Sequence, residues 1–318
     1  MPEIVMLVGI PGSGKSYAAK SEFGDDYVYL NRDTEGGRTV GLVPKMEAAL
    51  SQGAKRVVLD CTFLKPEDRQ PFITTATALD VPLHCWFFNT TPELAQFNIC
   101  WRMCERYGKV LRTKDDYAAV DKDPNMFSPT VLFAMLKKLK EMGKPSMSEG
   151  YASMKIVKPT PWTLPPEFNR EAVMLDYDGT VRLTKSGNKY PSRPDDIEAF
   201  PKAAKKLQEL AERGVLLLGA SNQSGVAKQN PPMKVAHDCF QETNRQLGVD
   251  IEYDFDYSRA GPITSWHRKP LPGMGVDAIW RHKLDPNKVT YVGDMTTDKT
   301  FAARSRFKFE WAKDFFDL

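Results

Sequence analysis

The sequence predicts an α/β protein of two domains, and three observations lead to that prediction. The 318 residues are enough for two domains of ordinary size. Short apolar runs alternate with helical patterns in each half, which favours parallel sheets covered on both faces. A proline-rich stretch near residue 160 separates the halves. We therefore expect domains at 1–158 and 168–318, joined by an extended linker at 159–167.

The expected elements follow from where apolar runs and helical spacings begin and end. In the first half, strands are expected at 3–8, 27–30, 56–60 and 82–88, and helices at 15–22, 44–52, 67–79, 92–107 and 128–142. In the second half, strands are expected at 172–176, 215–220, 252–256 and 289–293. A helix is expected at 198–213, because its apolar residues have helical spacing and Gly214 stands where a C-cap belongs.

Composition narrows the class of protein. No apolar run approaches the roughly 20 residues that a membrane-spanning helix needs, and no signal peptide is recognised at the N-terminus. A formal net charge of +3 does not indicate a protein that binds nucleic acid over its whole surface. Local basic patches are compatible with this net charge. The cysteines form no CxxC pair, which predicts a reducing, cytoplasmic setting: Cys61, Cys85, Cys100, Cys104 and Cys239.

The segment GIPGSGKS, at residues 9–16, fits the pattern G-x-x-x-x-G-K-[ST] between an expected strand and an expected helix. Backbone N–H groups of such a loop wrap the β-phosphate of a nucleotide, and the lysine reaches the β- and γ-phosphates. A chance match in a tight turn is the alternative, which the flanking elements disfavour. The expected nucleotide-binding residues are Gly9, Gly12, Ser13, Gly14, Lys15 and Ser16, with Ser16 also an Mg²⁺ ligand.

The second strand leads into LNRDT, which places Asp33 beyond the carboxyl end of a strand, where open α/β sheets bind ligands. A carboxylate there can accept the proton of an attacking hydroxyl. Arg32 beside it is suited to an acceptor phosphate. The structural alternative makes Asp33 the N-cap of the next helix.

The third strand ends at Asp60, within KRVVLDCTF. A carboxylate at this place resembles the one that organises Mg²⁺ through water in P-loop enzymes. It is equally placed to orient groups that bind the acceptor, and Thr62 can add a hydrogen bond there. A helix cap is the structural alternative for Asp60.

Arg102 and Arg106 lie four residues apart and share one face of an expected helix. Arginines that arrive late in a P-loop domain commonly cover the phosphates and neutralise charge in the transition state. A solvated basic helix face is the alternative. Cys100 and Cys104 have the same spacing, but no further Cys or His accompanies them, which favours helix packing over zinc binding.

In the second half, LDYDGTV places Asp176 and Asp178 two residues apart at the end of a strand. Alternate residues of a strand point the same way, so both carboxylates can face one pocket. One member of such a pair attacks phosphorus, and the other carries the proton of the leaving oxygen. A calcium loop is the main alternative, but its further oxygen ligands and closing Glu are missing.

Later segments add polar groups that suit the same chemistry. Ser221 in LLLGASNQSG is suited to bind phosphate, and Lys269 in HRKPLPG supplies a point charge for a phosphoryl group. Each residue alone is compatible with a cap or turn, but their joint order argues against coincidence. With YVGDMTTDKT included, the expected magnesium-site carboxylates are Asp176, Asp178, Asp294 and Asp298, the last lying behind the direct ligands.

The segments DYDGT, ASNQSG, HRKPLPG and GDMTTDKT resemble, in this order, the motifs of the haloacid dehalogenase phosphatase superfamily. The resemblance implies a Rossmann-like domain, an aspartyl-phosphate intermediate on Asp176, and Asp178 as general acid and base. SGNKYP, SNQSG and RKPLPGM are similar to the branch that contains histidinol-phosphate, heptose-phosphate and polynucleotide 3′-phosphatases. The first two groups often carry a zinc loop, but FDYSRAGPITSWHRKP has no cysteine, which favours the polynucleotide branch.

The first half resembles the kinase module of bifunctional polynucleotide kinase-phosphatases in GIPGSGKS, LNRDT, LDCTF and ELAQFNICWR. The resemblance implies ATP as the phosphate donor, Mg²⁺, Asp33 as base for a 5′-hydroxyl and Arg32 as an acceptor-side contact. It implies Arg102 or Arg106 as the lid arginine, although the spacing there is looser. The expected partners are DNA or RNA termini and, functionally, a separate ligase, with no membrane; a homo-oligomer stays open.

Basic residues between 102 and 144, together with three aromatic residues, are of the types that bind a nucleic-acid strand. Trp101, Tyr107 and Trp266 could stack on terminal bases, which contributes ~1–3 kcal/mol per base where it occurs. The alternatives are a core position for Trp101 and a solvated helix face for the lysines between 137 and 144. The basic candidates are Arg102, Arg106, Lys109, Arg112, Lys114, Lys137, Lys138, Lys140 and Lys144.

Two other functions compete with end healing. A small-molecule kinase fused to a sugar or histidinol phosphatase keeps both chemistries but changes the substrate. A non-catalytic nucleic-acid-binding scaffold is disfavoured because both sets of catalytic residues are intact.

Overall fold

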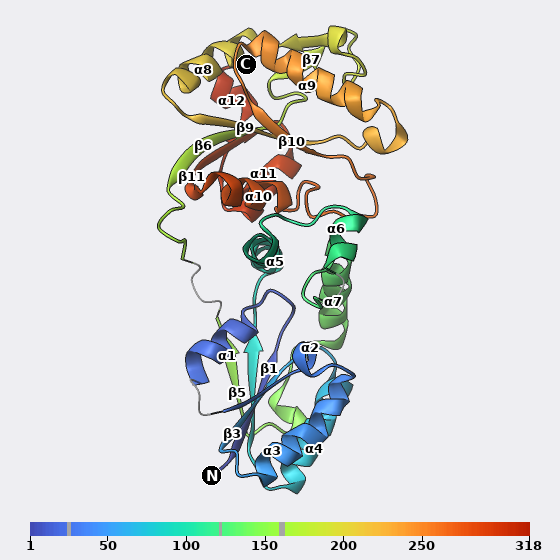
Figure 1. The fold of residues 1–318 in the computed structure, drawn as a ribbon, viewed down its shortest axis with the longest axis vertical. Coiled ribbons are helices and arrows are strands. Elements are labelled where there is room, and N and C mark those ends of the chain that lie inside the picture. The colour runs from blue at the N-terminus through green and yellow to red at the C-terminus, as the bar shows by residue number, and fades with distance from the viewer. Residues whose placement is uncertain (24–26, 121–122, 159–162) are drawn as a thin grey trace. The chain divides into compact units, whose positions relative to one another are not determined.

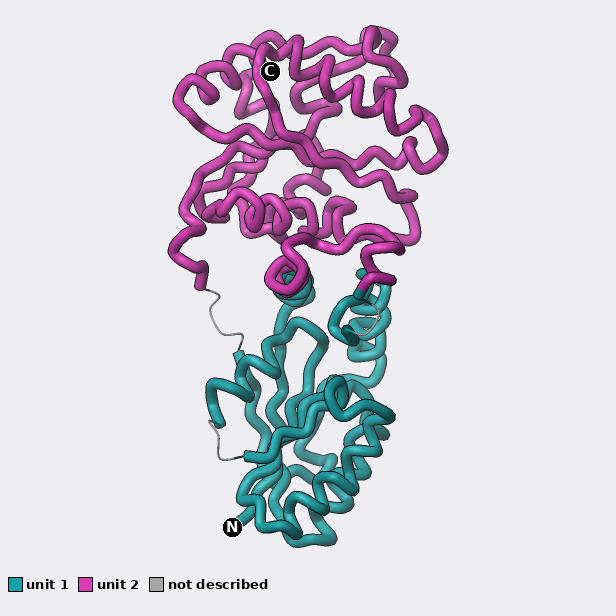
Figure 2. Tube along the Cα trace, in the orientation of Figure 1, with its two compact units in different colours: residues 1–99, 120–162 teal, residues 100–119, 163–318 magenta. Residues whose placement is uncertain are grey.

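The structure is a computed structural model that describes residues 1–23, 27–120, 123–158 and 163–318. The chain forms two compact units, which Figure 2 colours separately. Unit 1 comprises residues 1–99 and 120–162, and unit 2 comprises residues 100–119 and 163–318. The expected linker at 159–167 falls partly outside the described residues, because 159–162 are not among them.

Unit 1 is built on a parallel sheet with the strand order β2-β3-β1-β4-β5. Figure 1 labels its strands β1, β3 and β5. Alternate residues of β1 face opposite sides of this sheet. Ile4 and Met6 join the larger hydrophobic core, whereas Val5 and Leu7 join a smaller core with α1. The strands are β1 (Glu3–Val8), β2 (Val28–Asn31), β3 (Arg56–Asp60), β4 (Leu83–Phe88) and β5 (Ser153–Val157).

The helices of unit 1 cover both faces of the sheet, which confirms the expected arrangement. Met46 of α3 and Phe72 of α4 are fully buried in the larger core, and Ala19 of α1 is buried in the smaller one. The helices are α1 (Lys15–Phe23), α2 (Arg32–Glu35), α3 (Leu42–Ser51), α4 (Pro66–Ala78), α5 (Pro92–Tyr107) and α7 (Pro129–Met142). The end of α5 belongs to unit 2.

Unit 2 contains a second parallel sheet, with the strand order β10-β9-β6-β11-β12. A two-stranded antiparallel hairpin, β7 with β8, follows the first strand of this sheet in the chain. The strands are β6 (Arg170–Leu175), β7 (Arg182–Thr184), β8 (Ile197–Ala199), β9 (Leu216–Asn222), β10 (Glu252–Asp256), β11 (Leu284–Gly293) and β12 (Lys308–Trp311).

Helices also pack on the sheet of unit 2. Leu207 of α8 and Phe240 of α9 are fully buried in one core with Leu175 of β6. The helix expected at 198–213 is present as α8, but it begins only at Pro201, because residues 198 and 199 belong to β8. Gly214 follows the helix with φ 76°. The helices are α6 (Lys114–Ala119), α8 (Pro201–Glu212), α9 (Met233–Leu247), α10 (Gly273–His282), α11 (Thr296–Ser305) and α12 (Ala312–Phe316).

Residues 100–119 pack within unit 2, although the expected domain boundary placed them in the first domain. Val110 and Leu111 are buried, and the Val110 amide donates to Asp277 Oδ1 at 3.0 Å. The ring of Trp101 lies 5.3 Å from that of Phe168 and 5.4 Å from that of Trp280, measured between centroids. These partners are far away in the sequence, so apolar spacing alone does not reveal the assignment.

The burial of the cysteines and the properties of the helices can be compared with the expectations from composition. Cys100 and Cys104 are fully buried, which confirms their expected packing role. The cysteines are free thiols. Among the described residues, no helix combines the length and the apolar character needed to cross a lipid bilayer.

Candidate active sites

The loop between β1 and α1 has a backbone that only glycine adopts easily at two positions. Gly12 has φ 75° and Gly14 has φ 93°. A Cβ at Gly12 would lie 2.5 Å from the carbonyl oxygen of Ala95 on α5, so side chains are excluded there by contact as well. Asn98 Nδ2, one turn along α5, donates to the carbonyl of Gly12 at 2.8 Å. The start of α5 therefore holds the shape of the loop.

Lys15 and Ser16 open α1 directly after this loop. Lys15 Nζ donates to the carbonyls of Gly9 at 2.9 Å and Ile10 at 3.1 Å, so the ammonium lies over the loop itself. Ser16 Oγ donates to Asp60 Oδ2 at 2.6 Å. A strand, a glycine loop and a helix N-terminus thus bring together a cation, a hydroxyl and a carboxylate where a nucleotide phosphate can bind.

Asp60 collects three hydrogen bonds on one oxygen. Besides Ser16, the Tyr29 hydroxyl donates to Oδ2 at 2.5 Å and Asn31 Nδ2 donates to it at 3.1 Å. Burial and the neighbouring carboxylate raise the pKa of Tyr29, which keeps the phenol protonated as a donor. Carboxylate and hydroxyl oxygens are the donors that Mg²⁺ prefers, so Ser16 and Asp60 fit that ion.

Asp33 is not the N-cap of α2, because Asn31 takes that role. Asn31 Oδ1 accepts from the Asp33 amide at 2.7 Å, and Asp33 lies in the first turn. The Asp33 carboxylate is ion-paired with Arg32, so the expected base and acceptor contact lie side by side after β2. Thr62 contributes its carbonyl, which accepts from the Gly9 amide at 3.1 Å.

The two candidate lid arginines lie on the last turns of α5. Arg102 is half-buried and Arg106 is exposed, and both belong to the segment that packs in unit 2. Their role over the phosphates stays a prediction.

In unit 2, the structure gathers the predicted phosphatase residues around one pocket of about 670 Å³. The pocket lies at the carboxyl ends of the strands of the sheet, as expected for an open α/β fold. Its lining includes all of the predicted residues of the second half: Asp176, Asp178, Ser221, Lys269, Asp294 and Asp298.

Lys269 lies at the centre of the buried charges. Its Nζ is 2.9 Å from Asp176 Oδ1 and 2.7 Å from Asp298 Oδ1, and it donates to the Tyr291 hydroxyl at 2.8 Å. The neighbouring carboxylates raise the pKa of Lys269 against the effect of its burial, so the ammonium stays charged. The lysine therefore holds the Asp176 carboxylate in place and adds positive charge beside it.

Three carboxylates of the pocket fit a divalent cation. One oxygen each of Asp176, Asp294 and Asp298 lies within 4.8 Å of the others. Burial raises the pKa of Asp176 to about 6 and also raises that of Asp294, and in both cases the charge of Asp298 adds to the effect. A cation would relieve this repulsion, and an all-oxygen ligand set suits Mg²⁺.

The hydrogen-bond partners of Asp178 differ from those of the three clustered carboxylates. Arg182 Nε donates to its Oδ1 at 2.8 Å, and Gln223 Nε2 donates to its Oδ2 at 2.9 Å. Gln223 also donates to Ser221 Oγ at 3.1 Å. The side chain of Asp178, predicted both as acid/base and as metal ligand, is therefore not brought into the carboxylate group, and its position suits proton transfer.

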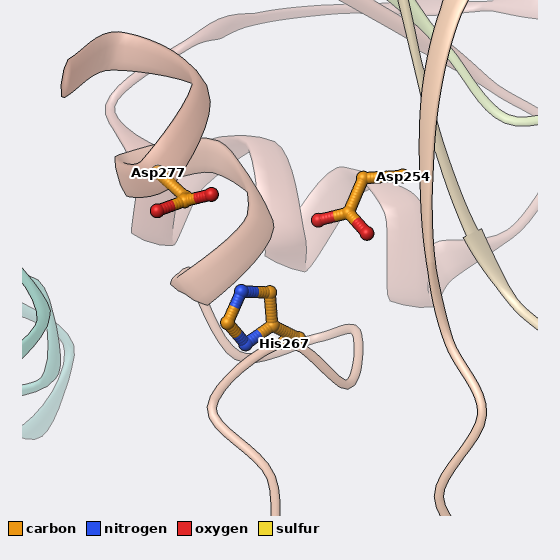
Figure 3. Close-up of side chains that lie close together, drawn as sticks. All are labelled: Asp254, His267 and Asp277. Carbon is orange, nitrogen blue, oxygen red and sulfur yellow. The ribbon is translucent and has the colours of Figure 1, made fainter. Parts of the chain in front are cut away.

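A second polar cluster in unit 2 surrounds His267, which stands shortly before Lys269 in the sequence. Asp254 on β10 and Asp277 on α10 point toward the buried ring of His267 (Figure 3). Arg112 Nη2 lies 2.7 and 2.6 Å from the two carboxylate oxygens of Asp254, and Arg281 Nε lies 3.3 Å from Asp277 Oδ2. Because these arginines already neutralise both carboxylates, we assign the cluster a structural role.

The burial of Trp101 and Trp266 contradicts the prediction that these two residues stack on terminal bases. Trp266 is fully buried and Trp101 is 6% exposed, so neither can stack on a terminal base. For Trp101 the core alternative is confirmed. Tyr107 is 39% exposed and remains accessible.

Sequence reasoning missed several residues of the two sites. Arg182 and Gln223 lie close to predicted motif residues. Their polar side chains beside those motifs could have indicated that they belong to the site. Tyr29 and Asn31 could have been found from their place at the end of a predicted strand. Tyr291 was missed because a tyrosine inside an apolar strand is expected to be a residue of the hydrophobic core.

Two family models match the chain, one in each half. Residues 4–110 match the family described as AAA domain, and residues 171–316 match the family described as polynucleotide kinase 3 phosphatase. The second match covers the sheet and all the pocket residues of unit 2.

Several known proteins are similar to this chain. A D-glycero-D-manno-heptose-1,7-bisphosphate 7-phosphatase of Thermosynechococcus vestitus is 31% identical over 144 residues, 41% of this chain and 71% of that protein. A bifunctional polynucleotide phosphatase/kinase of Schizosaccharomyces pombe is 33% identical over 110 residues, 34% of this chain and 26% of that protein. A chain in a structure of the Pnkp1/Rnl/Hen1 RNA repair complex is 16% identical, with 98% of this chain and 95% of that chain covered and a TM-score of 0.32.

The family matches join a P-loop domain to a haloacid dehalogenase-type phosphatase domain, in agreement with both sets of motifs. With a phosphate-binding loop in unit 1 and a carboxylate pocket in unit 2, the chain combines the two kinds of domain that its motifs share with the bifunctional polynucleotide kinase-phosphatases.

Proposed function

We propose that this enzyme heals the ends of broken nucleic acid strands. Unit 1 transfers the γ-phosphate of ATP to a 5′-hydroxyl, and unit 2 hydrolyses a 3′-phosphate. A ligase needs a 5′-phosphate and a 3′-hydroxyl, so the two reactions prepare both ends of a break for sealing by a separate enzyme. The observation that carries the proposal is the presence in one chain of both sets of residues together with the polynucleotide kinase 3 phosphatase match.

In the kinase reaction, the backbone amides of residues 9–16 hold the ATP phosphates, and the Lys15 ammonium moves from the loop carbonyls to the β- and γ-phosphates. Asp33 accepts the proton of the 5′-hydroxyl as its oxygen attacks phosphorus. Arg32 binds the phosphate of the acceptor strand, and Arg102 or Arg106 neutralises charge on the transferred group.

In the phosphatase reaction, a carboxylate oxygen of Asp176 attacks the phosphorus of the 3′-phosphate and the bond to the 3′-oxygen breaks. Asp178 gives its proton to that leaving oxygen. The resulting aspartyl phosphate is then cleaved by water, whose proton returns to Asp178. Ser221 and Lys269 bind the phosphoryl oxygens, and Gln223 links Ser221 to Asp178.

Mg²⁺, held by Ser16 and Asp60 in unit 1 and by Asp176, Asp294 and Asp298 in unit 2, would supply charge neutralisation for the phosphoryl oxygens.

End-labelled oligonucleotides test the proposal. One substrate carries a 5′-hydroxyl and the other a 3′-phosphate, each as DNA and as RNA, with ATP and Mg²⁺ present. We expect phosphate gain at the first end and phosphate loss at the second. Histidinol phosphate and a heptose bisphosphate serve as competing phosphatase substrates. Rapid turnover of either small ester with no reaction at both oligonucleotide ends would contradict the proposal.

A further inference from the structure

We propose that an apolar rim on the phosphatase pocket binds the nucleoside that carries the 3′-phosphate. The rim consists of Leu183, Tyr190 and Met295, and the Tyr190 ring stacks on the terminal base. This inference rests on the proposed 3′-phosphatase function and names how that site recognises its substrate.

The pocket is much larger than its catalytic chemistry needs. A volume of about 670 Å³ lies within the ~300–1,000 Å³ typical of sites for drug-sized ligands. Besides the catalytic carboxylates and Lys269, its lining includes Asn188, Lys189 and Tyr190 from the connection between β7 and β8. A phosphate alone leaves most of this space to the group that bears it.

Exposed apolar side chains of unit 2 gather at this pocket. In the described part of the unit, the large apolar residues exposed to solvent are Tyr107, Leu183, Tyr190, Met295 and Leu318. Three of these five line the pocket, with Leu183 50%, Tyr190 51% and Met295 44% exposed. Single exposed apolar residues are ordinary, whereas a group of them around one pocket marks a binding surface.

The rim residues come from two separately anchored elements. Leu183 lies in β7, and Tyr190 follows in the connection to β8. The buried carboxylate of Asp196 holds that connection, because it accepts from the Ser186 amide and from Ser186 Oγ, each at 2.8 Å. Met295 directly precedes α11 and follows Asp294 of the carboxylate group. Each element is therefore anchored by a buried carboxylate, since Asp196 holds the β7–β8 connection and Asp298 Oδ2 accepts from the Met295 amide at 3.1 Å.

The chemistry of the rim suits a nucleoside better than a sugar. Apolar and aromatic faces bind a planar base, and stacking on an aromatic side chain is tolerant of base identity. The Lys189 ammonium lies 5.3 Å from the centre of the Tyr190 ring, where it can also attract a backbone phosphate. A polyhydroxylated sugar would gain little from Leu183, Tyr190 and Met295.

The test compares two 3′-phosphorylated oligonucleotides that differ only at the last residue. One ends in an ordinary nucleotide, and the other ends in an abasic deoxyribose with the same 3′-phosphate. For the wild-type enzyme we expect KM to be at least about fivefold lower with the base present. Tyr190→Ala should raise KM for the base-bearing end to the abasic value while kcat changes by less than about twofold. Tyr190→Phe and the control Leu318→Ala should match wild type.

A binding measurement supplies a second readout. In the Asp176→Asn background, with Mg²⁺ present, 2-aminopurine at the 3′-terminal position should be quenched on binding, and Tyr190→Ala should abolish the quenching. Equal KM values for the two ends in the wild-type enzyme, or an unchanged base preference in Tyr190→Ala, would contradict the proposal that the rim binds the terminal nucleoside. Absence of reaction at both 3′-phosphates, with turnover of a sugar phosphate, would instead refute the proposed function.

Discussion

At the scale of single residues, Gln223 connects the Ser221 hydroxyl, proposed to bind phosphate, with the Asp178 carboxylate, proposed to transfer the proton. It donates to Asp178 Oδ2 and to Ser221 Oγ. General acid–base catalysis contributes typically about 10²–10⁴-fold, and it depends on the placement of the acid. We therefore expect Gln223→Leu to lower the phosphatase kcat by at least about tenfold in steady-state assays.

Gln246→Leu is a matched control for Gln223→Leu, because Gln246 Nε2 binds Ile197 and Glu242 away from the pocket lining. Both variants should retain kinase activity. A Gln223→Leu enzyme with wild-type kcat would show that Asp178 is positioned by Arg182 alone.

His267 makes the stability of unit 2 depend on pH. Burial, with Arg112 adding to it, lowers the pKa of His267 to about 3, whereas an unfolded histidine titrates near ~6.5. The unfolded chain therefore binds the proton first as pH falls, so the contribution of neutral His267 is complete above pH ~6.5 and is lost toward pH ~3. The slope is about 1.4 kcal/mol per pH unit.

Urea unfolding at about pH 7.5 and pH 5.0 tests this dependence. His267→Gln should lessen the loss of unfolding free energy between the two pH values by about 2 kcal/mol relative to wild type. Taking the difference between the two proteins cancels the contribution of the carboxyl groups they share. The same loss in both proteins would mean that His267 has about the same pKa in the folded protein as in the unfolded chain.

The sequence was sufficient to predict the charged residues of both sites but not their partners. Asp176 and Asp294 directly follow apolar strands, whereas Lys269 was indicated by the HRKPLPG segment in the loop after β10. All three line the pocket of unit 2. The hydrogen bonds of Arg182 to Asp178 and of Tyr29 to Asp60 depend on the fold, because neither residue belongs to a motif. The solvent exposure of aromatic side chains also depends on the fold. Trp266 and Tyr190 are both aromatic, but only Tyr190 is exposed to solvent.

At the scale of elements, the phosphate-binding loop depends on its contact with α5. A side chain at Gly12 meets both an unfavourable φ and the Ala95 carbonyl, whereas a Cβ at Gly14 meets only the unfavourable φ. We expect Gly12→Ala to abolish measurable kinase activity and to spare the phosphatase. Gly14→Ala should keep measurable kinase activity, and ATP titrations should give it a KM above that of the wild type. Equal losses would show that backbone strain alone decides.

Elements with strong apolar patterns were predictable, and those with weak patterns were not. The strands at β1 and β3 are nearly all buried, so their apolar runs stand out. β5 (Ser153–Val157) lies at the edge of its sheet, is mostly exposed and shows no such run. The short hairpin β7–β8 is held by the buried Asp196, whose role depends on a partner ten residues away.

At the scale of the whole molecule, the phosphate-binding loop and the carboxylate pocket lie in different units. Lys15 and Asp60 lie in unit 1, and Asp176 and Lys269 lie in unit 2. We expect Lys15→Ala to abolish 5′-phosphorylation and to leave 3′-phosphate removal intact, and Asp176→Asn to do the reverse. Assays of both ends on the same preparations provide the comparison. Loss of both activities in a folded Lys15→Ala protein would show that the sites are not independent.

The packing of residues 100–119 in unit 2 limits how this enzyme can be dissected or rearranged. The AAA-domain match ends at residue 110, inside a stretch whose Val110 and Leu111 are buried in the other unit. A fragment cut after residue 158 would carry those apolar side chains away from their partners, and the remaining phosphatase would lose part of its core. The two domains are interleaved along the chain, so neither can be exchanged by recombination at the proline-rich junction without a compensating change in the other.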